Sequence, residues 1–350
     1  MMPVMRACHR RGLAFQLIAS GQNDIERSEL LKYCGKVKPD HVLHSGPIRK
    51  NALGLLLWFT KTLLLSIWRL RPVFSQHKRG QGILVVHGDT VSTVMGALLG
   101  KLYGLQVAHV EAGLRSFDFF HPFPEEIDRV ITSRLADIHF CPNAWSVGNI
   151  KAKRGEKIDT GHNTLLDALA IAQAETNVSQ QVNQLRREPY FVFVMHRQEN
   201  LFNDELVRNL VAKVIQQSKA THCVFILHHL TEVALDRLGL LEKLKHIKTL
   251  TTVRRMPYVE FMQLLSTAEY VVTDGGSNQE ECYYLGKPCL VLRKVTERTE
   301  GLGQNVVLSK LNPATIDDFL ANPERYAKPP VEAINSPSGI IVSWLDGERL

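Results

Sequence analysis

The sequence contains few cysteines, and no two of them form a close pair. Among its 350 residues there are six cysteines, and none belongs to a Cys-x-x-Cys motif. Structural zinc sites and disulfide frameworks both depend on closely spaced cysteines, so this spacing argues against both. Scattered single thiols are typical of a reducing compartment, and we expect the protein to be cytoplasmic. The six positions are Cys8, Cys34, Cys141, Cys223, Cys282 and Cys289.

Long blocks of basic residues are also missing. The formal net charge is +7 at pH 7, yet the Lys and Arg residues are scattered and are not interleaved with aromatic residues. Nucleic-acid-binding tails and surfaces usually show one of these two patterns, so nucleic acid is not an expected partner. The excess of positive charge fits a small phosphate-bearing ligand, and solvated surface lysines would explain it equally well.

No apolar run reaches the length of a membrane span. Residues 52–70 form the longest apolar stretch, but Lys61 interrupts it, and a bilayer span needs about 20 apolar residues in succession. We predict a buried or interface helix there, with loose membrane association as the alternative and without stable membrane insertion. The N-terminus shows no basic region, apolar core and cleavage site in order, so we expect no signal peptide.

What the sequence does contain is an alternation of short apolar strands and helices. Its apolar fraction of 45% is typical of a globular protein with a core. Strands separated by helices indicate parallel sheets with right-handed crossovers. The strands are predicted at residues 83–86, 106–110, 138–141, 190–195, 222–227, 270–272 and 289–292.

The length and this pattern predict two α/β domains, residues 1–170 and 171–350. The C-terminal segment could pack back on the first domain. A polar region at residues 173–188 marks the boundary, or else forms one exposed helix of the second domain.

A glycine-rich turn at residues 275–277 is the most informative segment. The strand at 270–272 leads into this Gly-Gly-Ser turn, and we expect a helix to begin at Asn278. Glycines let the backbone come close to a ligand, and free N–H groups at a helix start attract phosphate. Glu281, one turn into that helix, is placed to accept ribose hydroxyls. The layout predicts a site for a nucleoside diphosphate.

Polar side chains follow several other strands at their carboxyl ends, where ligands of open parallel sheets bind. The first half of the chain supplies carboxylates and the second half supplies cations. This division predicts a cleft between the two domains. The residues are Asp89, Glu111, His196, Arg197 and His229.

Some of these residues also have purely structural explanations. Asp89 could equally cap the helix that follows it. The Pro124-Glu125-Glu126 segment is first of all the pattern of a helix start, with Pro at the first position. Glu125 could form an ordinary i,i+4 pair with Arg129. His228 or His229 taken alone is more often a structural histidine, so both interpretations stay open.

Taken together, these motifs resemble the non-hydrolysing bacterial UDP-N-acetylglucosamine 2-epimerases, and the matches run in order from about residue 15 to the C-terminus. The resemblance implies two Rossmann-like domains with parallel sheets facing across a cleft, the GT-B arrangement, and a homodimer. The matching strings are His87-Gly88-Asp89-Thr90, His109-Val110-Glu111-Ala112-Gly113-Leu114-Arg115-Ser116, Pro124-Glu125-Glu126, Asp128-Arg129, Gly161-His162-Asn163-Thr164, His196-Arg197-Gln198-Glu199-Asn200, Thr273-Asp274, Gln279-Glu280-Glu281 and Thr296-Glu297-Arg298.

The resemblance also implies a reaction, the interconversion of UDP-GlcNAc and UDP-ManNAc for surface polysaccharide precursors. The C2 proton of the UDP-sugar is poorly acidic, so the family eliminates UDP to give a glycal and adds it back with C2 inverted. Carboxylates move the proton, cations hold the departing diphosphate, and a closed site excludes water. No metal or redox cofactor is required.

The family's functional residues can be assigned by their positions in the matching motifs. His196, Arg197 and the turn amides would hold the diphosphate, and Glu281 would bind ribose. The candidate catalytic residues are Asp89, Glu111, Glu125 and His196. The candidate substrate-binding residues are Arg197, His229, Gly275, Gly276, Ser277, Glu281 and Arg298.

Four alternative functions stay open at this stage. They are a hydrolysing epimerase that releases UDP and ManNAc, an epimerase for a differently substituted UDP-sugar, a GT-B glycosyltransferase, and a UDP-sugar-binding protein with impaired catalysis.

The sequence departs from the family pattern in three places. The turn at 275–277 reads Gly-Gly-Ser where the family usually has Ser-Gly-Gly. Asn23 replaces a histidine in a region that helps bind a second, activating UDP-sugar, so we do not expect that regulation. The family's opening strand with Gly-Thr-Arg-Pro-Glu has no counterpart before the helix expected at residues 3–10. We predict either a start codon placed too far downstream or a poorly active form.

Overall fold

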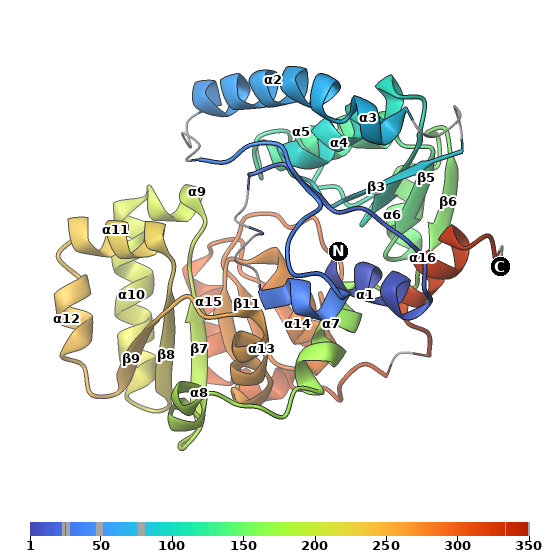
Figure 1. The fold of residues 1–350 in the computed structure, drawn as a ribbon. Helices are drawn as coiled ribbons and strands as arrows, with labels where there is room; N and C mark the ends of the chain where they lie inside the picture. The colour runs from blue at the N-terminus through green and yellow to red at the C-terminus, as the bar shows by residue number, and fades with distance from the viewer. Residues whose placement is uncertain (23–24, 26–28, 47–51, 76–80, 333, 349–350) are drawn as a thin grey trace. The chain divides into compact units, whose positions relative to one another are not determined.

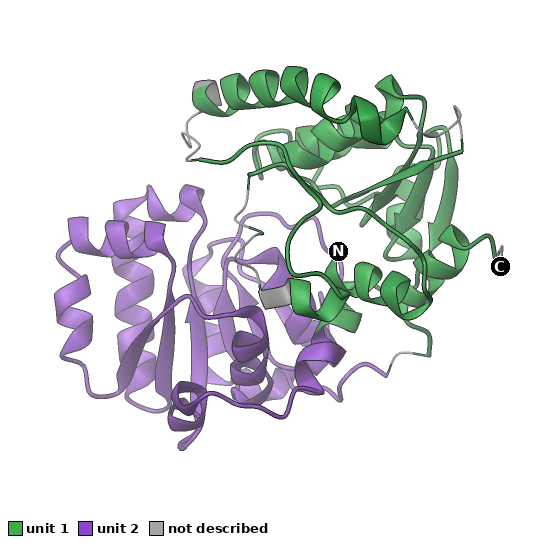
Figure 2. Ribbon diagram, in the orientation of Figure 1, with its two compact units in different colours: residues 1–168, 334–350 green, residues 169–333 purple. Residues whose placement is uncertain are grey.

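The computed structural model describes the chain apart from residues 23–24, 26–28, 47–51, 76–80, 333 and 349–350 (Figure 1). The chain divides into two compact units (Figure 2). Unit 1 comprises residues 1–168 and 334–350, and unit 2 comprises residues 169–333. The C-terminal segment thus belongs to unit 1. Asn23, which bears on regulation, lies outside the described residues.

Unit 1 contains a four-stranded parallel sheet in the order β3-β4-β5-β6. Strands β4 and β5 are mostly buried, as parallel strands covered on both faces should be, whereas β3 is largely half-buried. Strands β1 and β2 pair in parallel with one another as a separate sheet. The prediction about a missing first strand stays a prediction. The strands are β1 Ile18–Ala19, β2 His41–Val42, β3 Ile83–His87, β4 Gln106–Val110, β5 Ile138–Cys141 and β6 Glu156–Asp159.

Helices pack around this sheet within unit 1. Helix α1 lies beside α16, and α2 lies over α4 (Figure 1). No described helix combines the length and the apolar character needed to cross a membrane. The helices are α1 Met2–Arg10, η1 Glu29–Cys34, α2 Ala52–Arg69, α3 Arg71–Phe74, α4 Val91–Leu102, α5 Glu125–Leu135, α6 Ala144–Asn149, α7 Leu165–Gln173, which continues into unit 2, and α16 Pro337–Leu345.

Unit 2 contains a six-stranded parallel sheet in the order β12-β11-β10-β7-β8-β9. The strands are β7 Tyr190–Val194, β8 His222–Leu227, β9 Leu250–Arg254, β10 Val271–Thr273, β11 Cys289–Val291 and β12 Val306–Leu308. The helices are α8 Gln180–Leu185, α9 Gln198–Leu201, α10 Asp204–Ser218, α11 His229–Arg237, α12 Leu241–Lys245, α13 Tyr258–Thr267, α14 Gly276–Leu285, α15 Pro313–Ala321 and η2 Pro323–Tyr326.

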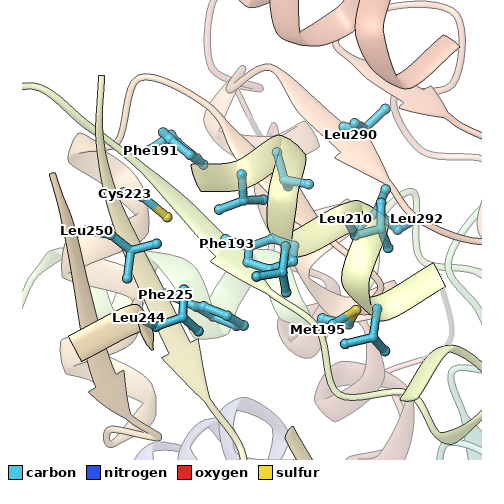
Figure 3. Close-up of a cluster of buried hydrophobic side chains, with 14 of the residues drawn as sticks. Phe191, Phe193, Met195, Leu210, Cys223, Phe225, Leu244, Leu250, Leu290 and Leu292 are labelled. Atoms are coloured by element: carbon cyan, nitrogen blue, oxygen red, sulfur yellow. The ribbon is translucent and has the colours of Figure 1, made fainter. Parts of the chain in front are cut away.

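The core of unit 2 follows from the alternation of side chains along β7. Phe191, Phe193 and Met195 point to one face of the sheet, because residues two apart on a strand share a face. They lie in one buried cluster with side chains of α10, α11 and α15. Figure 3 shows part of this cluster, including Leu210 of α10. The rings of Phe193 and Phe225 are 4.5 Å apart between centroids. Each fully buried Phe contributes about 1.5–3 kcal/mol relative to an exposed one, so this cluster anchors the strands that carry the polar turns.

The predicted fold class, α/β with parallel sheets in two domains, is confirmed. The strands predicted at 106–110, 138–141 and 222–227 coincide with β4, β5 and β8. Two helix starts were wrong by one or two residues: α14 begins at Gly276 rather than Asn278, and α5 begins at Glu125, with Pro124 as its N-cap residue.

Candidate active site

Glu111 immediately follows β4 and has a left-handed backbone, with φ of 68°. This conformation costs a residue other than glycine about 1–3 kcal/mol and persists only where the surroundings enforce it. Two side chains lie against its carboxylate. Asn163 donates from Nδ2 to Oε1 at 2.7 Å, and His87 Nε2 lies 3.9 Å from Oε2. The strained backbone therefore presents a carboxylate that is held from one side by an amide.

Gly88 lies directly against the Glu111 carboxylate. Its φ of 72° favours glycine, and an added Cβ would lie 3.4 Å from Oε2 of Glu111. His109 Nε2 bonds the carbonyl oxygen of Gly88 at 2.8 Å. Burial is the largest cause that lowers the pKa of His109, to about 4, so this histidine is neutral at pH 7 and donates through Nε2. The turn after β3 is thereby fixed from the neighbouring strand.

Asp89 is held by an arginine and does not cap α4. The N-cap residue of α4 is Thr90, whose N–H donates to Thr93 Oγ1 at 3.3 Å. The guanidinium of Arg129 donates to the Asp89 carboxylate and, at 3.1 Å, to Glu126. Of the two interpretations left open for Asp89, the structure rules out capping, because the following threonine is the N-cap residue.

The segment Pro124-Glu125-Glu126 carries two carboxylates with different surroundings. Glu126 is fully buried and accepts hydrogen bonds from the Ser116 N–H at 3.0 Å and from Arg115. Burial by itself would raise the pKa of Glu126, but these donors outweigh it and the net pKa is lowered. Glu126 is thus a structural anion, whereas Glu125 is only half-buried. This difference favours Glu125 over Glu126 as a carboxylate that can reach a ligand.

In unit 2 the carboxylate of Asp274 organises the end of β7. Asp274 follows β10, is fully buried and accepts from the backbone N–H groups of His196 at 3.0 Å and Arg197 at 2.9 Å. The Nδ2 of Asn200 donates to it at 3.1 Å. One buried anion thus fixes the two consecutive residues that were predicted to hold a diphosphate.

His196 stacks on His228 rather than on the neighbouring His229. The two ring centroids are 4.7 Å apart, with an angle of 22° between the planes. Burial is the largest cause that lowers the pKa of His196, and the Asp274 charge opposes it. Burial and the nearby His196 lower the pKa of His228 to about 4. His229 is exposed at the first position of α11. Its assignment to the site stays a prediction, and His228 was expected only as a structural histidine.

The Gly275-Gly276-Ser277 turn is shaped by close neighbours. Gly275 N–H donates to Thr273 Oγ1 at 2.9 Å. An added Cβ on Gly276 would lie 3.0 Å from Oε1 of Glu297 and 3.1 Å from Nε of Arg298. Ser277 is exposed. An added Cβ at position 276 would therefore be crowded by these two side chains, and the turn opens α14 with amides of the kind that bind anions.

Arg298 lies beside that glycine and is buried. Its guanidinium bonds the carboxylate of Glu280, and Arg293 Nη2 lies 2.9 Å from Oε2 of Glu297. Each arginine at the base of the turn therefore has an acidic neighbour. These pairs fix the helix start and leave a guanidinium close to the backbone of Gly276.

Glu281 is buried on α14, with 2% of its surface exposed. Asn278 Nδ2 donates to its Oε2 at 2.8 Å. Burial is the largest cause that raises the pKa of Glu281, to about 7, while the bonds from Asn278 and Tyr258 lower it. The role of Tyr258 could not be predicted from the sequence, because this residue begins α13 and no local pattern links it to Glu281. A buried carboxylate with two polar neighbours can accept hydroxyl groups of a ligand.

A metal centre is not apparent in the described part of the chain. No group of three or more His, Cys, Asp or Glu side chains there is arranged to hold a metal ion. The polar groups of both units instead suit acid–base chemistry and the binding of an anion.

The two α/β units, the carboxylates after β3 and β4 and the glycine turn at the start of α14 are typical of a nucleotide-binding enzyme. The family model described as UDP-N-acetylglucosamine 2-epimerase matches residues 6–329, so the chain belongs to this family of isomerases. The predicted family membership is therefore confirmed.

Individual relatives agree with this assignment. The UDP-N-acetylglucosamine 2-epimerase of Methanococcus maripaludis is 33% identical over 319 residues, which are 87% of this chain and 82% of the relative. The UDP-2,3-diacetamido-2,3-dideoxy-D-glucuronate 2-epimerase of Pseudomonas aeruginosa is 32% identical over 303 residues, 83% of this chain and 79% of the relative. The crystal structure of the Methanocaldococcus jannaschii UDP-GlcNAc 2-epimerase with UDP-GlcNAc and UDP has a TM-score of 0.79 at 27% identity. It covers 99% of this chain and 95% of that one.

Proposed function

We propose that the protein interconverts UDP-GlcNAc and UDP-ManNAc by the non-hydrolysing route, in the cytoplasm, as a supplier of surface polysaccharide precursors. The observation that carries the proposal is Glu111, a carboxylate on a left-handed backbone held by Asn163. Strain of this kind is concentrated at functional sites. The names of the related proteins, which are 2-epimerases of UDP-sugars, support the substrate class.

We assign the sugar chemistry to unit 1. In elimination, one carboxylate takes the C2 proton, the bond between C1 and the phosphate oxygen breaks, and UDP leaves with that electron pair to give a glycal. In re-addition, the phosphate oxygen attacks C1 and a proton is delivered to the opposite face of C2. Three carboxylates can share the two proton transfers. They are Asp89, Glu111 and Glu125.

We assign the UDP part of the substrate to unit 2. Backbone amides of the turn at 275–277 and the side chains of His196 and Arg197 hold the diphosphate, which carries more negative charge as it departs. Arg298 adds positive charge next to the turn, and Glu281 accepts ribose hydroxyls. His229 contributes from the start of α11.

Deuterium incorporation tests the proposal. Purified protein is incubated with UDP-GlcNAc in D₂O and followed by proton NMR. We expect UDP-ManNAc to form and both epimers to carry deuterium at C2. Free ManNAc with UDP would show a hydrolysing enzyme instead. Bound UDP without exchange would show a binding protein, and turnover only with an added acceptor would show a glycosyltransferase.

The sugar substituents need a separate comparison. The Pseudomonas relative is named for a diacetamido uronate, so the same assay is run with UDP-GlcNAc and with that UDP-sugar at equal concentration. We expect UDP-GlcNAc to react with the higher kcat/KM. A higher kcat/KM with the diacetamido uronate would mean that the differently substituted UDP-sugar is the substrate.

We also propose that the protein is a homodimer, joined through α2. Several large apolar side chains of this helix are exposed, and patches of this kind mark contact surfaces. Sedimentation equilibrium should give twice the chain mass, and the double variant L57D/L64D should sediment as a monomer. Val233→Asp, which changes an exposed apolar residue of α11, should stay dimeric. Binding of the wild type to anionic vesicles as a monomer would favour a membrane role. The exposed fractions are Leu56 60%, Leu57 62%, Leu64 58% and Trp68 74%.

A further inference from the structure

Asp128 is a buried carboxylate that the roles above leave unused. It lies on α5, three residues after Glu125, and has 6% of its surface exposed. Residues three apart on a helix lie on the same side. Its Oδ2 is buried and has no hydrogen-bond partner among the described residues. An ionised carboxylate without a donor is costly in such a place, so the surroundings favour the protonated acid.

Most of the charged groups that face Asp128 raise its pKa. Burial is the largest cause that raises its pKa, and the negative charges of Asp89 and Glu125 raise it further, to about 7. Arg129 is the cation that lowers it. That guanidinium, however, donates to Asp89 and Glu126. The neighbours therefore include one carboxylate from the turn after β3 and two charged groups from α5 itself.

We propose that Asp128, whose buried Oδ2 has no hydrogen-bond partner among the described residues, is a positioning residue that holds a proton and so keeps the carboxylate cluster of Asp89 and Glu125 short of one negative charge. This inference rests on the proposed epimerase function. The neutral acid spares the site a further negative charge while the anionic UDP-sugar binds. Once Asp128 ionises, a third carboxylate charge repels that substrate, so kcat/KM falls.

Asp128→Asn tests the idea, because asparagine has nearly the same shape and stays neutral at every pH. Below pH 6 we expect kcat/KM of D128N to be close to that of the wild type. Between pH 6 and 9 the kcat/KM of D128N divided by that of the wild type should rise about tenfold, which is the effect of removing one nearby like charge. A merely structural role would lower activity in parallel at all pH values, and such a parallel profile would overturn the proposal. The surface variant Asp317→Asn should show the wild-type profile.

A second readout does not depend on catalysis. The folded protein binds a proton at Asp128 up to about pH 7, whereas the unfolded chain releases it near the ordinary aspartate pKa of 3.8. The melting temperature of the wild type relative to D128N should therefore fall as pH rises from 4 to 7 and stay level above 7. If the difference in melting temperature between the wild type and D128N were the same at every pH from 4 to 7, the claim that Asp128 holds a proton would be overturned. If the melting temperature followed this trend but the protein showed no deuterium exchange, Asp128 would titrate as inferred and the proposed epimerase function would be rejected.

Discussion

Asn163 donates its side-chain N–H to Glu111 across 2.7 Å and so orients a carboxylate whose own backbone is left-handed. The amide comes from the segment after β6 and the carboxylate from the turn after β4. The ends of two strands that lie on either side of β5 thus cooperate to aim a single oxygen pair. The consequence is that the amide should matter for the rate more than for substrate affinity.

Asn163→Ala should lower kcat by about 10²-fold with little change in KM, because a carboxylate displaced by about 1 Å loses its productive geometry. NMR rates with UDP-GlcNAc at several concentrations separate the two constants. Asn183→Ala, which removes an amide on the exposed helix α8, serves as the control. Wild-type kcat in N163A would show that Glu111 is oriented without the amide.

Gly276→Ala should both destabilise unit 2 and weaken UDP binding. The new Cβ would lie 3.0 Å from Oε1 of Glu297 and 3.1 Å from Nε of Arg298, and both side chains are buried. Overpacking of this kind costs about 1–3 kcal/mol. Urea unfolding measures the stability, and calorimetric titration with UDP should show a roughly tenfold loss of affinity, the equivalent of about 1.4 kcal/mol.

Gly148→Ala is the matched control for that substitution. Gly148 lies in helix α6, and nothing within 4 Å would meet an added Cβ. Because Ala is the better helix former by about 1 kcal/mol, G148A should equal or exceed the wild type in stability. Equal destabilisation by both variants would mean that contacts around Gly276 are not the cause.

UDP binding should depend on pH through Glu281. Burial raises the pKa of this carboxyl to about 7, and its ionised form is the stronger acceptor for ribose hydroxyls. Affinity for uridine should therefore increase as pH rises from about 6 to 8. Uridine is used because it lacks the phosphate groups, which titrate in the same range. Glu281→Gln should bind more weakly and show no such increase, and a wild-type affinity that is level over this range would contradict the role.

Much of the fold could be predicted because its signals are local. The runs at 106–110, 138–141 and 222–227 are apolar and closed by polar residues, so their bounds coincide with β4, β5 and β8. Helix starts were less accurate. Gly276 and Ser277 are poor helix formers, yet α14 begins there because tertiary contacts fix the turn.

The candidate site was predictable as a set of strand ends, but its pairings were not. The ring stacked on His196 belongs to His228 and not to the residue after it, since the register of the turn between β8 and α11 decides which one faces inward. The contact of Glu281 with Tyr258 joins the consecutive helices α13 and α14 across the strand β10. A single sequence carries no signal for such contacts, because they depend on how the elements pack.

Asp274→Asn should lower the stability of unit 2 and shift the titration of His196. The buried carboxylate accepts from the N–H groups of His196 and Arg197 and from Asn200, and hydrogen bonds to a charged group contribute about 1.5–3 kcal/mol each. We expect a loss of about 3 kcal/mol in urea unfolding. The negative charge of Asp274 also raises the pKa of His196 against the larger effect of burial, so the variant should titrate at lower pH in proton NMR. Asp317→Asn, on the exposed side of α15, should change neither quantity. If D274N kept the wild-type stability and His196 titration, the backbone of residues 196 and 197 would owe its position to other contacts.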